Sequence, residues 1–278
     1  MKRRNADLVR LTTTALFLAL TVILSRLPFL SAYLMIGGVN LVEIGFAAIP
    51  AMICALLNGP IYGLICSAGA DLIGALAFPN GSMTFYPGFT IDAALFGLIP
   101  VMVLKLVKGK KKEESILMAI IIAIASFGLY SCLPFVERIK LDGGSDFQVS
   151  TPIKAMIAIA FSAVALILVM IVFILSKRES KQIERPFVLT DILLVYLIRD
   201  FLIKSFMAPM WLTSLYGIPY EVSFISQLLT SLITAPVDLI ITAIVIYPLA
   251  NVYKDQLALT YREKKHIYSK VYKGKALC

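Results

Sequence analysis

Histidine is almost absent from this 278-residue sequence, and its absence excludes several kinds of catalysis. The only histidine is His266, in a basic C-terminal stretch, so neither an HExxH zinc motif nor a serine–histidine pair can form. The stretch SAGAD (67–71) lacks the second aspartate motif that an aspartyl intramembrane protease needs. We therefore expect no catalytic residues, no metal site and no cofactor, and we predict that the protein is not an enzyme.

Charged residues are also scarce. They make up 15% of the chain, against about 25% in a typical globular protein, and 59% of the residues are hydrophobic. Several apolar runs approach the roughly 20 residues with which a helix crosses a bilayer. A membrane barrel would instead show alternating segments of about 10 residues. The composition predicts an all-α, polytopic membrane protein that forms a single integral membrane domain over residues 1–278.

Cysteine pairs and nucleotide-binding loops are missing too. The four cysteines have no CxxC spacing, and small packing residues are their simplest interpretation. No GxxxxGK(S/T) phosphate-binding loop is present, and the polar segments are too short for a nucleotide-binding domain. If ATP drives this protein, another chain must be the ATPase.

About eight membrane spans are expected from the apolar runs. Their approximate bounds are 8–26, 41–57, 60–78, 88–107, 115–135, 152–176, 187–213 and 222–250. The formal net charge is +9, and the basic segments all follow an even number of crossings. By the positive-inside rule both termini are cytoplasmic. This placement explains the basic charge without nucleic acid, and we expect no nucleic-acid partner.

Two outward stretches are rich in aromatic residues, glycine and proline. In FPNGSMTFYPGFT (78–90), Phe85, Tyr86 and Phe89 offer flat faces, and Gly88 leads into a new helix whose first amides can receive polar groups. This composition suits the wall of a pocket for a planar, polar molecule. The alternative is a stiff turn within an interfacial aromatic belt.

The second outward stretch is MWLTSLYGIPY (210–220), with the only tryptophan, Trp211, and with Tyr216. Two such stretches make a shared binding face more plausible than either would alone. Arg26, near the outer end of the first helix, is well placed to meet a ligand carboxylate.

Seven charged residues fall inside the predicted spans. Such residues are rare in membrane helices and usually face the bundle interior. They are Glu43, Asp71, Asp92, Arg199, Asp200, Lys204 and Asp238. Two interpretations stay open: an internal ion-pair network that fixes helix packing, in which Arg199 meets an acid from another helix, or an ion relay. The second would make the protein a stand-alone proton- or ion-coupled secondary transporter.

In the first helix, Ala15 and Ala19 are four residues apart on one face. Small residues at this spacing let another membrane helix approach closely. The motif is weak on its own, because apolar helices often contain it.

Four segments together resemble a known family, the substrate-binding S components of energy-coupling-factor (ECF) vitamin transporters, of the folate type. The segments are ALFLALTVILSRLPF (15–29), LLNGPIYGLICSAGADLIGALAFPNG (56–81), YPGFTIDAALFGLIP (86–100) and MWLTSLYGIPY (210–220), the last followed by TAPVDL (234–239). The resemblance covers roughly residues 8–108 and 187–250.

The resemblance implies a bacterial, multi-pass cell-membrane protein that binds a vitamin from outside. S components associate with a membrane coupling subunit and two cytoplasmic ATPases, so those partners are expected here. Ala15 and Ala19 would then mark the coupling-subunit face. Arg26, Phe85, Tyr86, Asp92 and Trp211 would contact the vitamin.

Three departures from the family pattern qualify the ligand. The chain is longer than the family, and we expect an inserted transmembrane hairpin at roughly 113–176. Ala208 stands where folate-type members commonly have asparagine, and Asp92 replaces a small or neutral polar residue. A pocket that loses an amide and gains a carboxylate can prefer another compound. We therefore expect folate or a related vitamin-like molecule.

Overall fold

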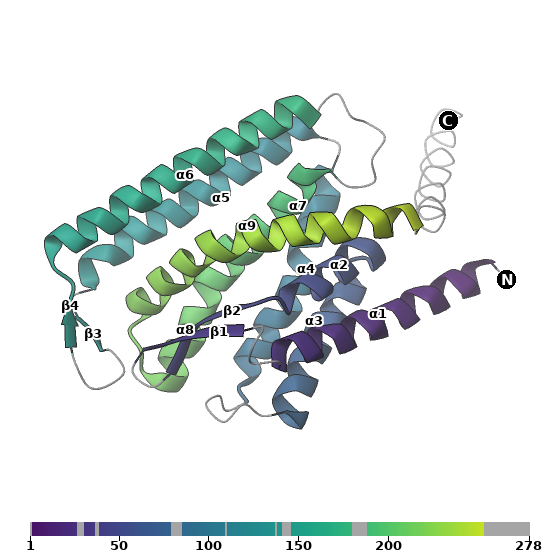
Figure 1. Cartoon of the computed structure of the whole chain (residues 1–278), viewed down its shortest axis with the longest axis horizontal. Coiled ribbons are helices and arrows are strands. Elements are labelled where there is room, and N and C mark those ends of the chain that lie inside the picture. The colour runs from purple at the N-terminus through teal and green to yellow at the C-terminus, as the bar shows by residue number, and fades with distance from the viewer. Residues whose placement is uncertain are drawn as a thin grey trace, which may run out of the picture.

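The computed structural model describes residues 2–26, 31–36, 39–78, 85–108, 110–136, 138–140, 146–179 and 188–252. Within them the chain forms an elongated helical bundle with two short β-hairpins (Figure 1). The helices are α1 (Lys2–Arg26), α2 (Ala48–Asn58), α3 (Pro60–Ala77), α4 (Pro87–Val107), α5 (Lys111–Cys132), α6 (Thr151–Glu179), α7 (Leu189–Tyr196), α8 (Ser205–Tyr216) and α9 (Tyr220–Val252). A π-helix, η3 (Leu197–Lys204), joins α7 to α8, and a 3₁₀ turn, η2 (Leu133–Phe135), follows α5.

The predicted all-helical membrane fold is confirmed. Six helices of the described residues are long and apolar enough to cross a membrane, and the chain is a multi-pass membrane protein. They are α1, α3, α4, α5, α6 and α9. The run α7–η3–α8 is a further long helical segment with a π-helical middle. The N-terminus of α1 and the C-terminus of α9 lie at the same end of the bundle (Figure 1), as an even number of membrane crossings requires. The count of eight spans stays a prediction.

The expected second span is where the structure differs from the sequence prediction. Residues 41–57 are not one helix: β2 (Val39–Gly45) pairs antiparallel with β1 (Ser31–Ile36), and α2 begins only at Ala48. β-Branched residues such as Val42 and Ile44 fit a strand as well as a helix, so apolar character alone could not separate the two. A second hairpin pairs β3 (Arg138–Lys140) with β4 (Asp146–Gln148).

Close helix packing fixes the α3–α4 pair that positions the outer end of α4. A Cβ atom on Gly97 would lie 2.2 Å from the backbone oxygen of Gly63, so the two backbones touch where neither residue has a side chain. Ser67, Ala70 and Gly74 continue this buried face along α3. Small residues at such spacing allow close approach of membrane helices. Position and tilt of α4 are therefore set by α3.

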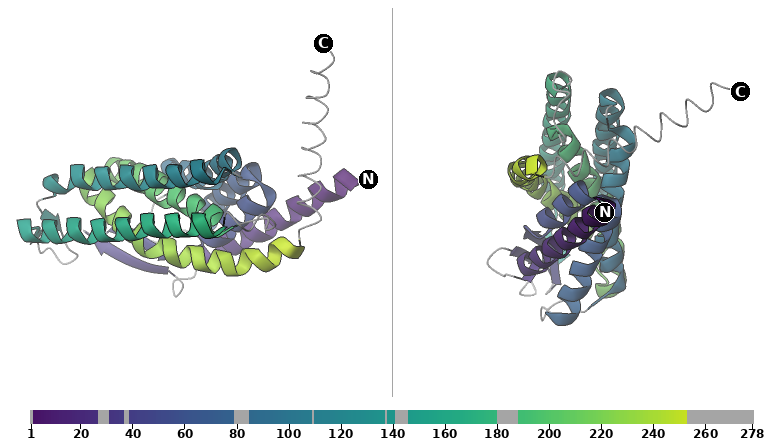
Figure 2. Two further views of the ribbon diagram at one scale, coloured as in Figure 1. Left: turned by 90° about the horizontal axis from the view of Figure 1, so that it is seen from above. Right: turned by 90° about the vertical axis from the view of Figure 1, so that its right-hand side faces the viewer.

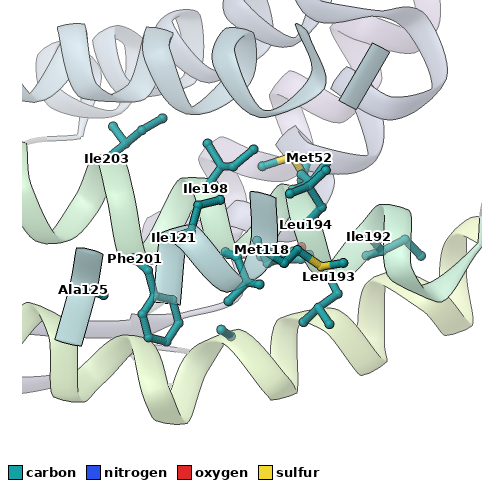
Figure 3. Packing of buried hydrophobic residues seen from close by; sticks show 14 of the residues in the cluster. Met52, Met118, Ile121, Ala125, Ile192, Leu193, Leu194, Ile198, Phe201 and Ile203 are labelled. Atoms are coloured by element: carbon teal, nitrogen blue, oxygen red, sulfur yellow. The ribbon is translucent and has the colours of Figure 1, made fainter. Parts of the chain in front are cut away.

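The two helices of the predicted hairpin, α5 and α6, run side by side along one flank (Figures 1 and 2). Their roles in packing differ. On α5, Met118 and Ala125 are fully buried and face a core formed with α2, α7 and η3 (Figure 3). Most large apolar side chains of α6 are exposed, including Met156 and Leu166 at 70% and 71%. Thus α5 belongs to the core, and α6 covers it from outside.

Candidate functional site

The candidate site lies where the first turns of α4 meet α8. Tyr86 precedes α4 in extended conformation, and Pro87 occupies the first helical position, where its missing N–H removes no helical hydrogen bond. Gly88 is buried in the first turn, and Asp92 follows one turn later on the same helix. The sequence YPGFTID therefore starts a helix and places a carboxylate one turn inside it.

A hydrogen bond joins the two elements. The indole Nε1–H of Trp211 on α8 donates to Oδ1 of Asp92 at 2.9 Å. Asp92 is 3% exposed, and its other oxygen, Oδ2, has no hydrogen-bond partner among the described residues. A carboxylate accepts several hydrogen bonds, and burial makes an unfilled acceptor unfavourable. One side of Asp92 is thus anchored by the protein, and the other lacks a donor.

Aromatic rings surround this hydrogen bond. The ring of Tyr86 lies 5.9 Å from that of Trp211 and 6.0 Å from that of Phe89, between ring centroids, in tilted and edge-on arrangements. Gly88 lies directly under them: a Cβ atom there would be 2.5 Å from Cδ2 of Trp211 and 2.7 Å from Cε1 of Tyr86. The glycine therefore lets the rings close over the first turn of α4. These four residues and Asp92 are referred to below as the Asp92 site.

The Asp92 site brings together five of the residues that the sequence singled out, from stretches more than 100 positions apart. Phe85 adjoins it and is 40% exposed. Tyr216 lies at the end of α8, five residues after Trp211, with its hydroxyl buried and without a hydrogen-bond partner among the described residues. Arg26 is the last residue of α1, and its side chain lies outside the described part. Residues 79–84 of the first aromatic stretch also lie outside it.

One neighbouring contact was missed by the sequence reasoning. Thr90 on α4 donates a 2.6 Å hydrogen bond from its hydroxyl to Oδ2 of Asp71 on α3. The sequence predicts Asp71 as a charge inside a span and not as a binding residue. Asp71 lies six residues before the end of α3 and Thr90 three residues after the start of α4, and in an antiparallel helix pair such similar depths indicate that the two helix ends are neighbours.

A second buried polar cluster lies deeper in the bundle. Nη1 of Arg199 is 3.1 Å from Oδ2 of Asp238 on α9 and 3.4 Å from Oδ1 of Asp200, its neighbour in η3. The guanidinium carbon also lies 5.8 Å from the ring centre of Phe96 and 5.5 Å from that of Tyr196. The expectation that Arg199 meets an acid from another helix is confirmed. These contacts tie α4, η3 and α9 together.

Ala15 and Ala19 are both exposed on α1. The opposite side of α1 packs on α2 and α3, and Nδ2 of Asn58 donates 3.0 Å hydrogen bonds to the hydroxyls of Thr13 and Thr14. This polar contact holds α1 so that the face with Ala15 and Ala19 points away from the rest of the bundle.

Comparison with known proteins gives two related sequences, and no family model matches the chain. Folate transporter FolT of Leuconostoc mesenteroides subsp. mesenteroides is 30% identical over 118 residues, which are 42% of this chain and 58% of the relative. Folate transporter FolT of Clostridium novyi is 34% identical over 59 residues, or 21% of this chain and 33% of the relative. The chain thus matches less than two thirds of either relative's length. The predicted resemblance to folate-type transporters is confirmed at this level.

Among solved structures, the crystal structure of FolT bound with folic acid aligns with this chain. The alignment covers 84% of this chain and 89% of the FolT chain. The sequence identity is 18% and the TM-score is 0.45.

Proposed function

We propose that this protein is the membrane-embedded substrate-binding subunit, the S component, of an ECF-type transporter, and that it captures folate or a related vitamin-like molecule. The observation that carries the proposal is the Asp92 site: a half-satisfied buried carboxylate enclosed by aromatic rings at the end of the bundle predicted to face outward. Two relatives named folate transporter support the same ligand class.

The residues of the Asp92 site suit a planar heterocycle with polar edges. Tyr86, Phe89 and Trp211 provide ring faces and edges for contact with such a molecule. The unsatisfied Oδ2 of Asp92 provides an acceptor among the aromatic rings. Aromatic walls with a few fixed polar groups are typical of small-molecule sites. Arg26 stays our prediction for the contact to a ligand carboxylate.

The energy source in this proposal lies in partner chains. A membrane coupling subunit would pack against the exposed face of α1 that contains Ala15 and Ala19. Two cytoplasmic ATPase subunits would drive the complex between a ligand-binding and a releasing state. Because ligand binding can shift only an equilibrium between states that bind it differently, release requires a state in which the aromatic contacts are lost.

The proposal is tested by binding of folic acid to the purified chain and to its Tyr86→Ala and Trp211→Ala variants. Loss of a stacked ring should weaken binding about 5- to 150-fold, since each stacked contact contributes roughly 1–3 kcal/mol. Phe127→Ala is a matched control, because Phe127 is 73% exposed on α5, away from the site. If both site variants bind like the wild type, the Asp92 site does not contact the ligand.

A second candidate function is a stand-alone, ion-coupled secondary transporter. The buried cluster of Arg199, Asp200 and Asp238 favours it, because ionisable residues inside membrane bundles often belong to ion pathways. Co-purification separates the two: an S component should bring ATPase subunits with it, and its uptake should stop when ATP is depleted. A secondary transporter should purify alone, and its uptake should stop when an uncoupler dissipates the ion gradient.

A further inference from the structure

Of the two carboxylate oxygens of Asp92, only one lacks a hydrogen bond within the described residues. Oδ1 is held by the indole N–H of Trp211, and Oδ2 has no hydrogen-bond partner among the described residues. Because Trp211 donates and cannot accept, it fixes which oxygen faces the protein. Oδ2 is therefore the acceptor left for a donor from a ligand, and because it is fully buried, a ligand reaches it only when the side chains that cover it move.

The charge around Asp92 favours a donor as well. Within the described residues Asp92 forms no ion pair, and a second carboxylate, that of Asp71 on α3, accepts a hydrogen bond from Thr90, two residues before Asp92 on α4. Arg199 is occupied by Asp238 and Asp200. Two carboxylates on adjoining helices, of which Asp92 is buried and Asp71 is half-buried, attract N–H groups and repel carbonyl or carboxylate oxygens.

From these contacts we propose that Asp92 determines which heterocycle the protein accepts, by requiring an N–H donor, such as an exocyclic amino group, at the edge next to Oδ2. This inference rests on the proposed function and adds to it the chemical class of the ligand: a planar amino-substituted heterocycle of the amidine type. A heterocycle with a carbonyl at that position would set oxygen against oxygen. Any anionic tail of the ligand then lies away from Asp92.

The inference is tested with a matched ligand pair on the wild-type chain. Folic acid has an amino group at position 2 of its pteridine ring, and its 2-oxo analogue has a carbonyl there with the same size, shape and tail. Because the oxo compound loses a charge-assisted hydrogen bond and leaves Oδ2 unpaired, it should bind on the order of 10- to 100-fold more weakly. Calorimetric titration of both compounds gives the ratio.

The Asp92→Asn variant provides a second test, because it should weaken or invert the preference for folic acid over the 2-oxo analogue. In asparagine the side-chain oxygen should stay on the indole N–H of Trp211, so that the NH₂ group faces the ligand. The preference for the amino compound should therefore shrink or invert in favour of the 2-oxo compound. Combining it with Trp211→Phe, which removes the anchoring N–H and keeps an aromatic ring, should abolish any such inversion. Asp71→Asn is the control for removing one negative charge nearby, and it should keep the wild-type order.

Each result decides the matter. Tighter binding of folic acid than of its 2-oxo analogue, with the order changed by Asp92→Asn alone, supports the inference. Equal affinity of the wild type for both compounds overturns it and leaves the proposed function standing. If neither compound, nor any other vitamin, binds to a chain with native helix content, the proposed function itself fails and the role of Asp92 falls with it.

Discussion

At the scale of single residues, the position of Asp92 is the feature that most needs an explanation by function. A buried carboxylate in a membrane bundle is unfavourable unless it is fully hydrogen-bonded or paired. Here the protein supplies one N–H, from Trp211. Asp238, by contrast, accepts a 3.1 Å hydrogen bond from Arg199. A ligand donor is the simplest partner for the remaining oxygen.

Gly88→Ala tests the closeness of the ring packing over α4. The new Cβ would lie 2.5 Å from the indole of Trp211, closer than real Cβ contacts allow, so the ring must move and the hydrogen bond to Asp92 should break. We expect folic acid binding to weaken by about tenfold or more, consistent with losing a hydrogen bond to a charged group. Titration of the purified variant measures the change.

The matched control is Gly69→Ala on α3, where the added Cβ would meet only the end of the flexible Leu18 side chain, at 2.8 Å. This variant should bind folic acid as the wild type does. A Gly88→Ala variant with unchanged affinity would mean that the indole position is irrelevant to binding.

Much of the site was predictable at this scale, because aromatic residues beside glycine and proline are unusual between apolar runs. The sequence could not show that Asp92 pairs with Trp211, since that contact depends on how α4 and α8 face each other. The Thr90–Asp71 contact depends on how α3 and α4 face each other, for which the sequence offers only the similar depth of the two residues in their helices. Arg26 stays a prediction, because its side chain lies outside the described residues.

At the scale of elements, the π-helix η3 is the irregular part of the bundle. Widening the helix shifts hydrogen bonding by one residue, and the carbonyl of Asp200 accepts hydrogen bonds from the hydroxyls of Ser205 at 2.8 Å and of Ser231 on α9 at 3.3 Å. π-Helical segments often occur at functional positions. In this chain the segment places Arg199 and Asp200 against α9.

Removing the cation from this cluster should destabilise the fold. In Arg199→Met, the fully buried Asp200 and the nearly buried Asp238 lose the guanidinium between them. Breaking a buried ion pair on one side typically costs about 3–5 kcal/mol. Unfolding in detergent, followed by circular dichroism, should show a decrease of that order in the free energy of unfolding.

Lys110→Met is the corresponding control just before α5, where Lys110 lies 3.0 Å from the exposed carboxylate of Glu113. Loss of that pair should change stability by less than about 1 kcal/mol. Equal effects of the two substitutions would show that the buried cluster contributes nothing special to packing.

The exposed residues Ala15 and Ala19 of α1 give a prediction about the coupling subunit. Ala15→Leu with Ala19→Leu adds bulk to an exposed helix face without touching the core. Vitamin uptake in cells that contain the whole complex should be lost, because the helices can no longer approach closely, and ligand binding should be retained. The control is Ala155→Leu with Ala160→Leu, two exposed positions on α6. Uptake equal to that of the wild type would remove α1 as the coupling face.

Element types followed from the sequence for most of the long apolar runs, the exception being residues 41–57. The bounds of α3 and α4 agree with prediction within one residue. The β1–β2 hairpin did not follow, because its stability comes from pairing two segments, and pairing is invisible in the apolar pattern of either one.

At the scale of the whole molecule, the segment at 113–176 packs into the bundle through α5. Leu129 of α5 is fully buried, and Gly128 fits against Phe224 of α9, where an added Cβ would lie 2.6 Å from the ring. A chain without this segment would expose the core face of η3 and α9. That it is an insertion relative to a shorter family stays a prediction.

Gly128→Leu tests whether α5 is needed for stability. The larger side chain would push α5 away from Phe224, and overpacking of this kind costs roughly 1–3 kcal/mol. Ala163→Leu on the exposed side of α6 should change the unfolding free energy by less than about 0.5 kcal/mol. If both variants unfold like the wild type, α5 packs loosely and the hairpin is dispensable.

The most direct test of the account is to purify the chain in mild detergent, identify by mass spectrometry any small molecule that it carries, and titrate it with folic acid, thiamin, riboflavin and pantothenate in a calorimeter. The account predicts saturable binding of folic acid, one molecule per chain, and weaker or no binding of the other three. A chain with native helix content that binds none of these vitamins would contradict it.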